Sequence, residues 1–118
     1  MKTSTSFTGI YLHRDPIDFR KWVDGLVAIV KAEMRLDPFQ TYLFLFTNRR
    51  RDRIKALYWD KTGYAVWYKR LEQDKFAWPR KSAEQTLSLS HQQLEWLLDG
   101  YDFTRLKPHD ELRFASSF

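Results

Sequence analysis

Cysteine is absent from the 118-residue sequence. Disulfides, thiolate metal sites and cysteine nucleophiles are therefore excluded, and the chain suits a reducing compartment. No apolar stretch approaches the roughly 18 residues of a membrane span, and the first residues lack the apolar core of a signal peptide. We therefore expect a cytoplasmic protein without membrane contact, which associates with the nucleoid if it binds DNA.

The sequence also has few of the residue patterns that build catalytic or metal sites. His13, His91 and His109 lie far apart, and none has metal-ligand spacing. No glycine-rich loop resembles a phosphate cradle. A two-metal nuclease needs converging carboxylates, whereas Asp52 and Asp60 stand singly among basic residues, where ion pairing is the usual explanation. We predict that the protein is not an enzyme, with no catalytic residues, no metal site and no cofactor.

Positive charge is in excess, and it is unevenly distributed. The net charge is +5. Residues 49–81 hold 11 Lys/Arg against 4 Asp/Glu, a net charge of +7, whereas the remainder holds 9 against 11, a net charge of −2. Such a patch indicates an anionic partner, of which nucleic acid is the commonest. The alternative is a solvated strand face that protects a sheet edge from aggregation.

Short apolar or alternating runs, separated by turn residues, predict an antiparallel sheet. The turns of a three-stranded meander are expected at residues 48–53 and 60–63. Two further short runs can add to the meander. The predicted strands are residues 9–12, 42–46, 54–59, 64–70 and 87–89.

Two helices are expected beside the sheet. Asp15 and Pro16 are the residue types of a helix cap and a first helical position, and apolar residues follow them at three- and four-residue spacing. This long N-terminal helix should end before Asp37-Pro38 and lie across the meander. Ser90, with Gln93 in capping-box position, predicts a short C-terminal helix.

The predicted fold class is α+β. An antiparallel β-sheet, a meander of three to five strands, is packed by a long N-terminal helix and followed by a short C-terminal helix. We expect a single domain over residues 1–118. Its ordered core should cover residues of about 9–100, with a tail at 101–118 that is partly disordered or docked on another surface.

The basic turn and the strands after it supply the candidate binding residues. Arginine forks suit phosphate oxygens and guanine edges, and Arg51, Arg53 and Lys55 are expected to share one strand face. Aromatic rings can stack on nucleic-acid bases, although the core also needs aromatic residues. The candidate nucleic-acid-binding residues are Arg49, Arg50, Arg51, Arg53, Lys55, Trp59, Trp67, Lys69 and Arg70.

Numbering and charge suggest two further details of this surface. The odd numbers of Trp59 and Trp67 match those of Lys55 and Lys69, so a shared face would expose both tryptophans beside the lysines. The structural alternative for part of the arginine cluster is that Asp52 pairs with a neighbouring arginine and fixes the turn.

Three blocks of residues carry a family resemblance. The central block consists of Asn48-Arg49-Arg50-Arg51-Asp52-Arg53-Ile54-Lys55, Leu57-Tyr58-Trp59-Asp60, Gly63, Trp67-Tyr68-Lys69-Arg70-Leu71-Glu72 and Phe76-Ala77-Trp78-Pro79. The flanking blocks are Asp15-Pro16-Ile17-Asp18, Arg20-Lys21, Asp24-Gly25-Leu26 and the segment from Leu89-Ser90 to Gly100. Over roughly residues 9–100 the chain resembles the accessory protein TnpB, the second open reading frame product of insertion-sequence sixty-six type transposons.

The resemblance implies a bacterial mobile-element protein that supports transposition beside a separate, larger transposase. It implies no catalytic residues. Our leading hypothesis is an accessory protein that contacts DNA, at element ends or non-specifically, through the Arg-rich turn and an aromatic sheet face. The alternative is an adaptor that binds the element's transposase without reading DNA, because arginine and aromatic clusters also mark protein interfaces. The sequence does not indicate an oligomeric state.

Overall fold

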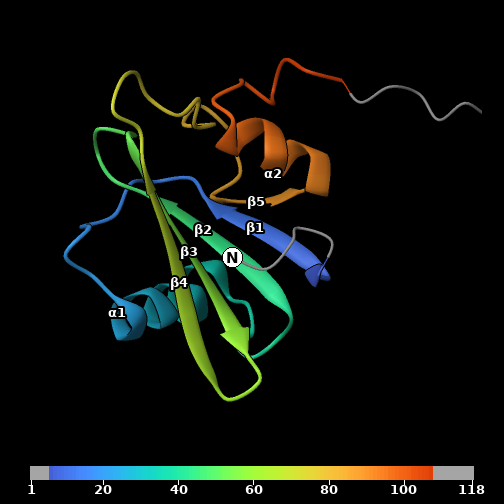
Figure 1. The fold of residues 1–118 in the computed structure, drawn as a ribbon. Coiled ribbons are helices and arrows are strands. Elements are labelled where there is room, and N and C mark those ends of the chain that lie inside the picture. Colours follow the sequence, from blue (N-terminus) through green and yellow to red (C-terminus); the bar gives the residue numbers. More distant parts are fainter. Residues whose placement is uncertain (1–5, 108–118) are drawn as a thin grey trace, which may run out of the picture.

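Five strands form at the positions where the sequence predicts them. The computed structural model describes residues 6–107. The strands are β1 (Gly9–His13), β2 (Tyr42–Thr47), β3 (Arg53–Asp60), β4 (Gly63–Arg70) and β5 (Thr86–Leu89). They pair into one sheet in the order β4-β3-β2-β1-β5 (Figure 1).

Neighbouring strands run in both directions, so the sheet is mixed. β2 pairs antiparallel with β3, and β3 pairs antiparallel with β4. β1 instead pairs parallel with β2, while its other edge pairs antiparallel with β5. The prediction of a wholly antiparallel sheet is therefore wrong at β1. The reason is the helical crossover between β1 and β2, which returns the chain to the end where β1 began.

Short helical segments cover both faces of the sheet. Side chains of the segments after β1 cluster with Phe44 of β2, whereas side chains of the segment after β5 cluster with Leu43. Successive strand residues point to opposite faces, so the two helical layers lie on opposite sides (Figure 1). Within residues 6–107, no helix has the length and apolarity needed to cross a membrane. The helical segments are α1 (Val23–Ile29), the π-helical turn η2 (Val30–Met34) and α2 (His91–Leu98).

The prediction of a long N-terminal helix is wrong, because helical structure is limited to the 12 residues of α1 and η2. Residues 14–22 are not helical. Their backbone groups find other partners: the Asp18 carboxylate accepts from the Arg20 N–H at 2.9 Å, and the Ile17 N–H donates to the Thr47 carbonyl at 2.9 Å. Such local side-chain bonds compete with helix formation.

The predicted helix after Ser90 is confirmed together with its cap. The Ser90 hydroxyl accepts from the Gln93 N–H at 3.1 Å, and the Gln93 side chain accepts from the Ser90 N–H at 2.8 Å. Phe103 lies within the predicted tail and is buried in the core. The single-domain organisation stays a prediction, and the part of the predicted tail at 108–118 lies outside the described residues.

Candidate nucleic-acid interface

The turn between β2 and β3 is held by one amide side chain. The Asn48 Oδ1 accepts from the backbone N–H groups of Asp52 and Arg53, at 3.2 Å each, and its Nδ2 donates to the Asp52 carboxylate at 2.7 Å. The Arg51 N–H donates to the Asn48 carbonyl at 3.0 Å, and Arg51 adopts a left-handed φ of 60°. The turn therefore has a defined backbone from which the arginine side chains project.

Asp52 is bound by Asn48 rather than by a neighbouring arginine, which was the structural alternative for the cluster. The hydrogen bond from Asn48 holds the pKa of the Asp52 carboxyl below its usual value, and the charges of Arg53 and Arg50 lower it further. The carboxylate is thus committed to the backbone of the turn. It forms no ion pair with the arginines around it in the part of the chain that the structure describes.

The arginines of the turn differ in how far they reach solvent. Arg49 and Arg50 are exposed, while Arg51 is half-buried. Among residues 6–107, no carboxylate forms an ion pair with any of these three. Arg53 is half-buried, and its buried Nε has no hydrogen-bond partner among the described residues, whereas Arg70 is exposed and pairs with a carboxylate, Glu72, at 2.8 Å.

Lys55 is buried, with 3% of its surface exposed. Its ammonium donates to the Phe19 and Lys21 carbonyls at 2.6 and 2.7 Å, and it lies 4.5 and 4.7 Å from the ring centroids of Phe19 and Trp22. Burial lowers the pKa of the Lys55 ammonium, while the charge of Asp18 opposes the shift. The side chain therefore anchors the loop before α1 to the sheet, and it does not face solvent as a phosphate contact would.

The two tryptophans lie on opposite faces of the sheet. Across β3 and β4, Lys55 is paired with Tyr68 and Ala56 with Trp67, so an odd residue of β3 faces the same way as an even residue of β4. The inference from odd numbering is therefore wrong. Lys55 and Trp59 lie on the face of the sheet that α1 covers, whereas Trp67 lies on the face that α2 covers.

Lys69, Trp59 and Trp67 all have structural contacts. The Lys69 ammonium donates at 2.9 Å to the Leu98 carbonyl at the end of α2, where the helix dipole favours a cation. Trp59 packs edge-on against Tyr64, with ring centroids 5.0 Å apart, and Trp67 packs against the core. The exposed candidates are thus Arg49, Arg50 and Arg70, and the nucleic-acid role of all nine residues stays a prediction.

A cavity of about 580 Å³ lies beside the turn and was not predicted from the sequence. Arg51 lines it together with residues 75–82 and part of the segment after α2. Its charged lining residues are Arg51, Lys75, Arg80, Lys81, Asp102 and Arg105. The charge of residues 75–81 was visible as part of the basic segment, but no pattern in the sequence indicates that Arg105 joins it.

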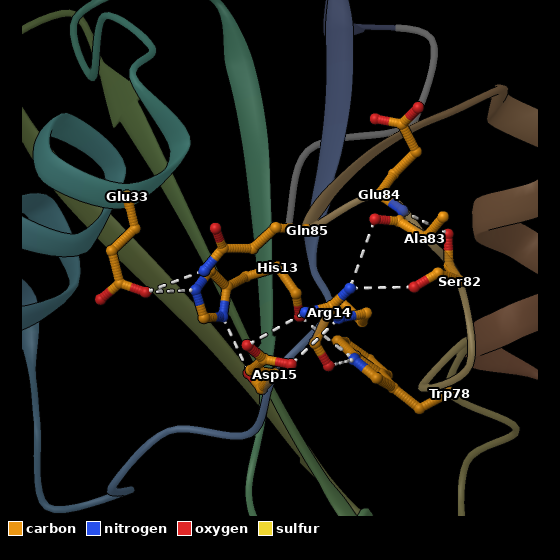
Figure 2. Close-up of polar contacts among 9 residues, drawn as sticks. All are labelled: His13, Arg14, Asp15, Glu33, Trp78, Ser82, Ala83, Glu84 and Gln85. Atoms are coloured by element: carbon orange, nitrogen blue, oxygen red, sulfur yellow. Dashed lines mark hydrogen bonds and ion pairs between the residues drawn. The ribbon is translucent and has the colours of Figure 1, made fainter.

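A polar network fixes the wall of this cavity to β1 (Figure 2). The indole N–H of Trp78 donates to the carbonyls of His13 and Arg14, at 3.1 and 2.9 Å. The Arg14 guanidinium donates to the Ser82 carbonyl at 2.9 Å. His13 is buried between the Asp15 carbonyl and the Glu33 carboxylate of η2, at 2.8 and 2.9 Å. These histidine contacts are structural, and no group of three or more His, Asp or Glu within residues 6–107 is placed to hold a metal ion.

The protein is a mixed five-stranded sheet covered by short helical segments, with exposed arginines in the turn between β2 and β3. The chain matches the family model described as IS66 Orf2 like protein over residues 8–108, and it belongs to this family. The resemblance found in the sequence is therefore confirmed. Membership suggests an accessory role in transposition, and the family is not known as a catalytic one.

Two curated relatives come from Sinorhizobium fredii. Uncharacterized protein y4jC is 36% identical over 98 residues, which cover 83% of this chain and 83% of the relative. Uncharacterized protein y4hO is 33% identical over 87 residues, which cover 73% of this chain and 74% of the relative. No solved structure matches the chain.

Proposed function

We propose that this protein is a transposition accessory protein that contacts the DNA backbone through Arg49, Arg50 and Arg51. The observation that carries the proposal is the turn itself. Asn48 and Asp52 fix its backbone, and its arginine side chains form no ion pair with a carboxylate among the described residues. Arginine side chains without a carboxylate partner can bind phosphate oxygens, to which they donate two parallel N–H hydrogen bonds.

DNA binding should depend on salt. Each phosphate contact releases counterions, so the logarithm of the affinity falls with the logarithm of the salt concentration by about 0.9 for each phosphate neutralised. We expect Arg49→Ala/Arg50→Ala to weaken binding to duplex DNA and to flatten this slope by up to about two. Fluorescence anisotropy across a salt series measures both quantities.

A matched control removes the same charge elsewhere. Lys31 on η2 and Lys61 in the β3–β4 turn are exposed and lie outside the arginine turn. The Lys31→Ala/Lys61→Ala variant should keep nearly the full slope. If both double variants weakened DNA binding equally, binding would depend on the net charge alone. That result would contradict specific phosphate contacts by the turn.

A second candidate function is an adaptor that binds the element's transposase. The observation that favours it is an exposed aromatic surface at Trp22 and Tyr68, which are 54% and 42% exposed. Both lie near Lys55, since its ammonium is 4.7 Å from the Trp22 ring centroid and Tyr68 is its partner across the strands. Exposed aromatic residues are enriched at protein interfaces. Trp22→Ala/Tyr68→Ala should then abolish co-purification with the transposase and leave DNA binding unchanged.

A further inference from the structure

The cavity beside the turn has a strongly positive lining. The charged residues of this lining are five cations and one carboxylate: Arg51, Lys75, Arg80, Lys81 and Arg105, and Asp102. Asp102 is already engaged, because it pairs with Arg105 at 3.4 Å and accepts from the Thr104 N–H at 3.0 Å. The lining therefore keeps an excess of positive charge for an anion from solution.

The walls of the cavity are fixed by hydrogen bonds before any ligand arrives. The Phe76 N–H donates to the Arg51 carbonyl at 2.7 Å, which ties the loop after β4 to the arginine turn. On the other side, Trp78 bonds to His13 at the end of β1, and both Trp78 and Ser82 bond to Arg14 directly after it, which holds the loop in place (Figure 2). A site formed in advance loses little free energy to reorganisation when it binds a ligand.

The size of the cavity limits what can occupy it. Its volume of about 580 Å³ is in the range of about 300–1,000 Å³ typical of small-molecule sites. One nucleotide fits in such a volume. A double helix, whose major groove alone is about 12 Å wide, can only lie across the opening.

We infer that this cavity binds the phosphorylated terminal nucleotide of a DNA strand. A terminal phosphate is a monoester that carries a charge of about −1.5 to −2 at neutral pH, compared with a single charge on each internal phosphate. A terminal phosphate is therefore attracted more strongly than an internal phosphate by the excess of cationic side chains in the cavity. The inference rests on the proposed DNA contact, because Arg51 belongs to both the turn and the cavity lining and places the strand end beside the duplex-binding surface.

The test separates the cavity from the turn by the choice of DNA. A dumbbell duplex, closed by loops at both ends, has no strand end and reports on the turn alone. A short single strand is compared with and without a terminal phosphate, at either end, and reports on the cavity. We expect the full-length protein to bind the phosphorylated strand about tenfold more tightly than the unphosphorylated one.

The cavity variant is Arg80→Ala/Lys81→Ala, which changes two exposed side chains. It should abolish the preference for the terminal phosphate and leave dumbbell binding close to that of Lys31→Ala/Lys61→Ala. The inference is overturned if the wild type shows no preference, or if the cavity variant keeps it. Arg49→Ala/Arg50→Ala tests the proposed function separately, because that proposal fails if the variant binds the dumbbell like the wild type.

A second measurement locates the ligand and identifies its chemistry. Titration with dAMP should shift the NMR signal of the Trp78 indole N–H, because Trp78 lines the cavity, and leave that of the exposed Trp22 unchanged. A shift at Trp22 alone would overturn the location. Competition against the phosphorylated strand should be stronger for dAMP than for inorganic phosphate, and equal competition would contradict a nucleotide site.

Discussion

Cationic side chains of the basic segment fall into two groups according to what they contact. Lys55 and Lys69 donate to backbone carbonyls inside the fold, whereas Arg49 and Arg50 reach solvent. The sequence could place the arginines in a turn, because Asn48 and the surrounding charges are typical of one. It could not assign the lysines, since a buried ammonium depends on carbonyls that a distant loop brings to it.

The role of Asn48 can be tested by truncation. Asn48→Ala removes three hydrogen bonds of the turn, so we expect a loss of about 1–3 kcal/mol in the free energy of unfolding at neutral pH. Urea unfolding measures the loss, with Gln73→Ala, an exposed loop change, as control. A variant as stable as that control would contradict the role assigned to Asn48.

The same variant should change the pH dependence of stability. The pKa of Asp52 is lower in the folded state than the value of about 3.9 expected in the unfolded chain. Ionised Asp52 therefore stabilises the fold above that value, and the contribution is lost as the pH falls through the folded-state pKa. The difference between wild type and Asn48→Ala should accordingly shrink on acidification.

Lys55 offers a test of structural against binding roles. Lys55→Met keeps most of the apolar stem but leaves the carbonyls of Phe19 and Lys21 without their donor. We expect a destabilisation of about 1–3 kcal/mol and DNA affinity within about twofold of a control that removes an exposed lysine, Lys61→Met. A larger loss of affinity in the well-folded Lys55 variant would show that the ammonium contacts DNA.

At the scale of elements, the strands were predictable and the first helix was not. Each strand is marked by local alternation and by turn residues at its ends, which are properties of the sequence within a few positions. The start of α1 depends instead on contacts that the loop before it makes with Thr47 of β2 and Lys55 of β3, which are distant in the sequence. Asp15 and Pro16 are typical of a helix start, but these tertiary contacts hold the residues after them in a non-helical loop.

The capping box of α2 should contribute measurably to stability. Ser90→Ala removes the side-chain acceptor for the Gln93 N–H, and loss of such a cap typically costs about 1 kcal/mol. Thermal or urea unfolding should reveal this loss, whereas Gln92→Ala, on the exposed side of the same helix, should have little effect. Equal stability of the two variants would mean that the packing of Leu94 and Leu97 alone holds the helix.

At the scale of the whole molecule, the concentration of charge was predictable, whereas the cavity was not. The excess of Lys and Arg in residues 49–81 can be counted directly. The cavity forms because the loop after β4 bonds to Arg51 and to β1, and because Arg105 returns beside it after α2. Contacts between segments so far apart in the chain produce no periodic pattern in the sequence.

We expect the protein alone to leave DNA uncut. Metal-dependent strand transfer requires carboxylates held around one or two ions, and Asp52 is engaged by Asn48 in the turn. Incubation of element-end DNA with the protein and magnesium or manganese should therefore give no specific nicks on a denaturing gel. Nicks that disappear in Asp52→Asn or Asp60→Asn would refute this expectation.

The pairing of β1 with β5 has a consequence for translation. The ribosome makes β1 first and β5 last, so the nascent chain can pair β2, β3 and β4 while one edge of β1 still lacks its neighbour. That edge carries free backbone donors and acceptors, which can recruit a strand of another polypeptide. Only when Thr86–Leu89 leaves the exit tunnel does the chain cover the edge with its own residues, so a product released before Thr86 would keep it open.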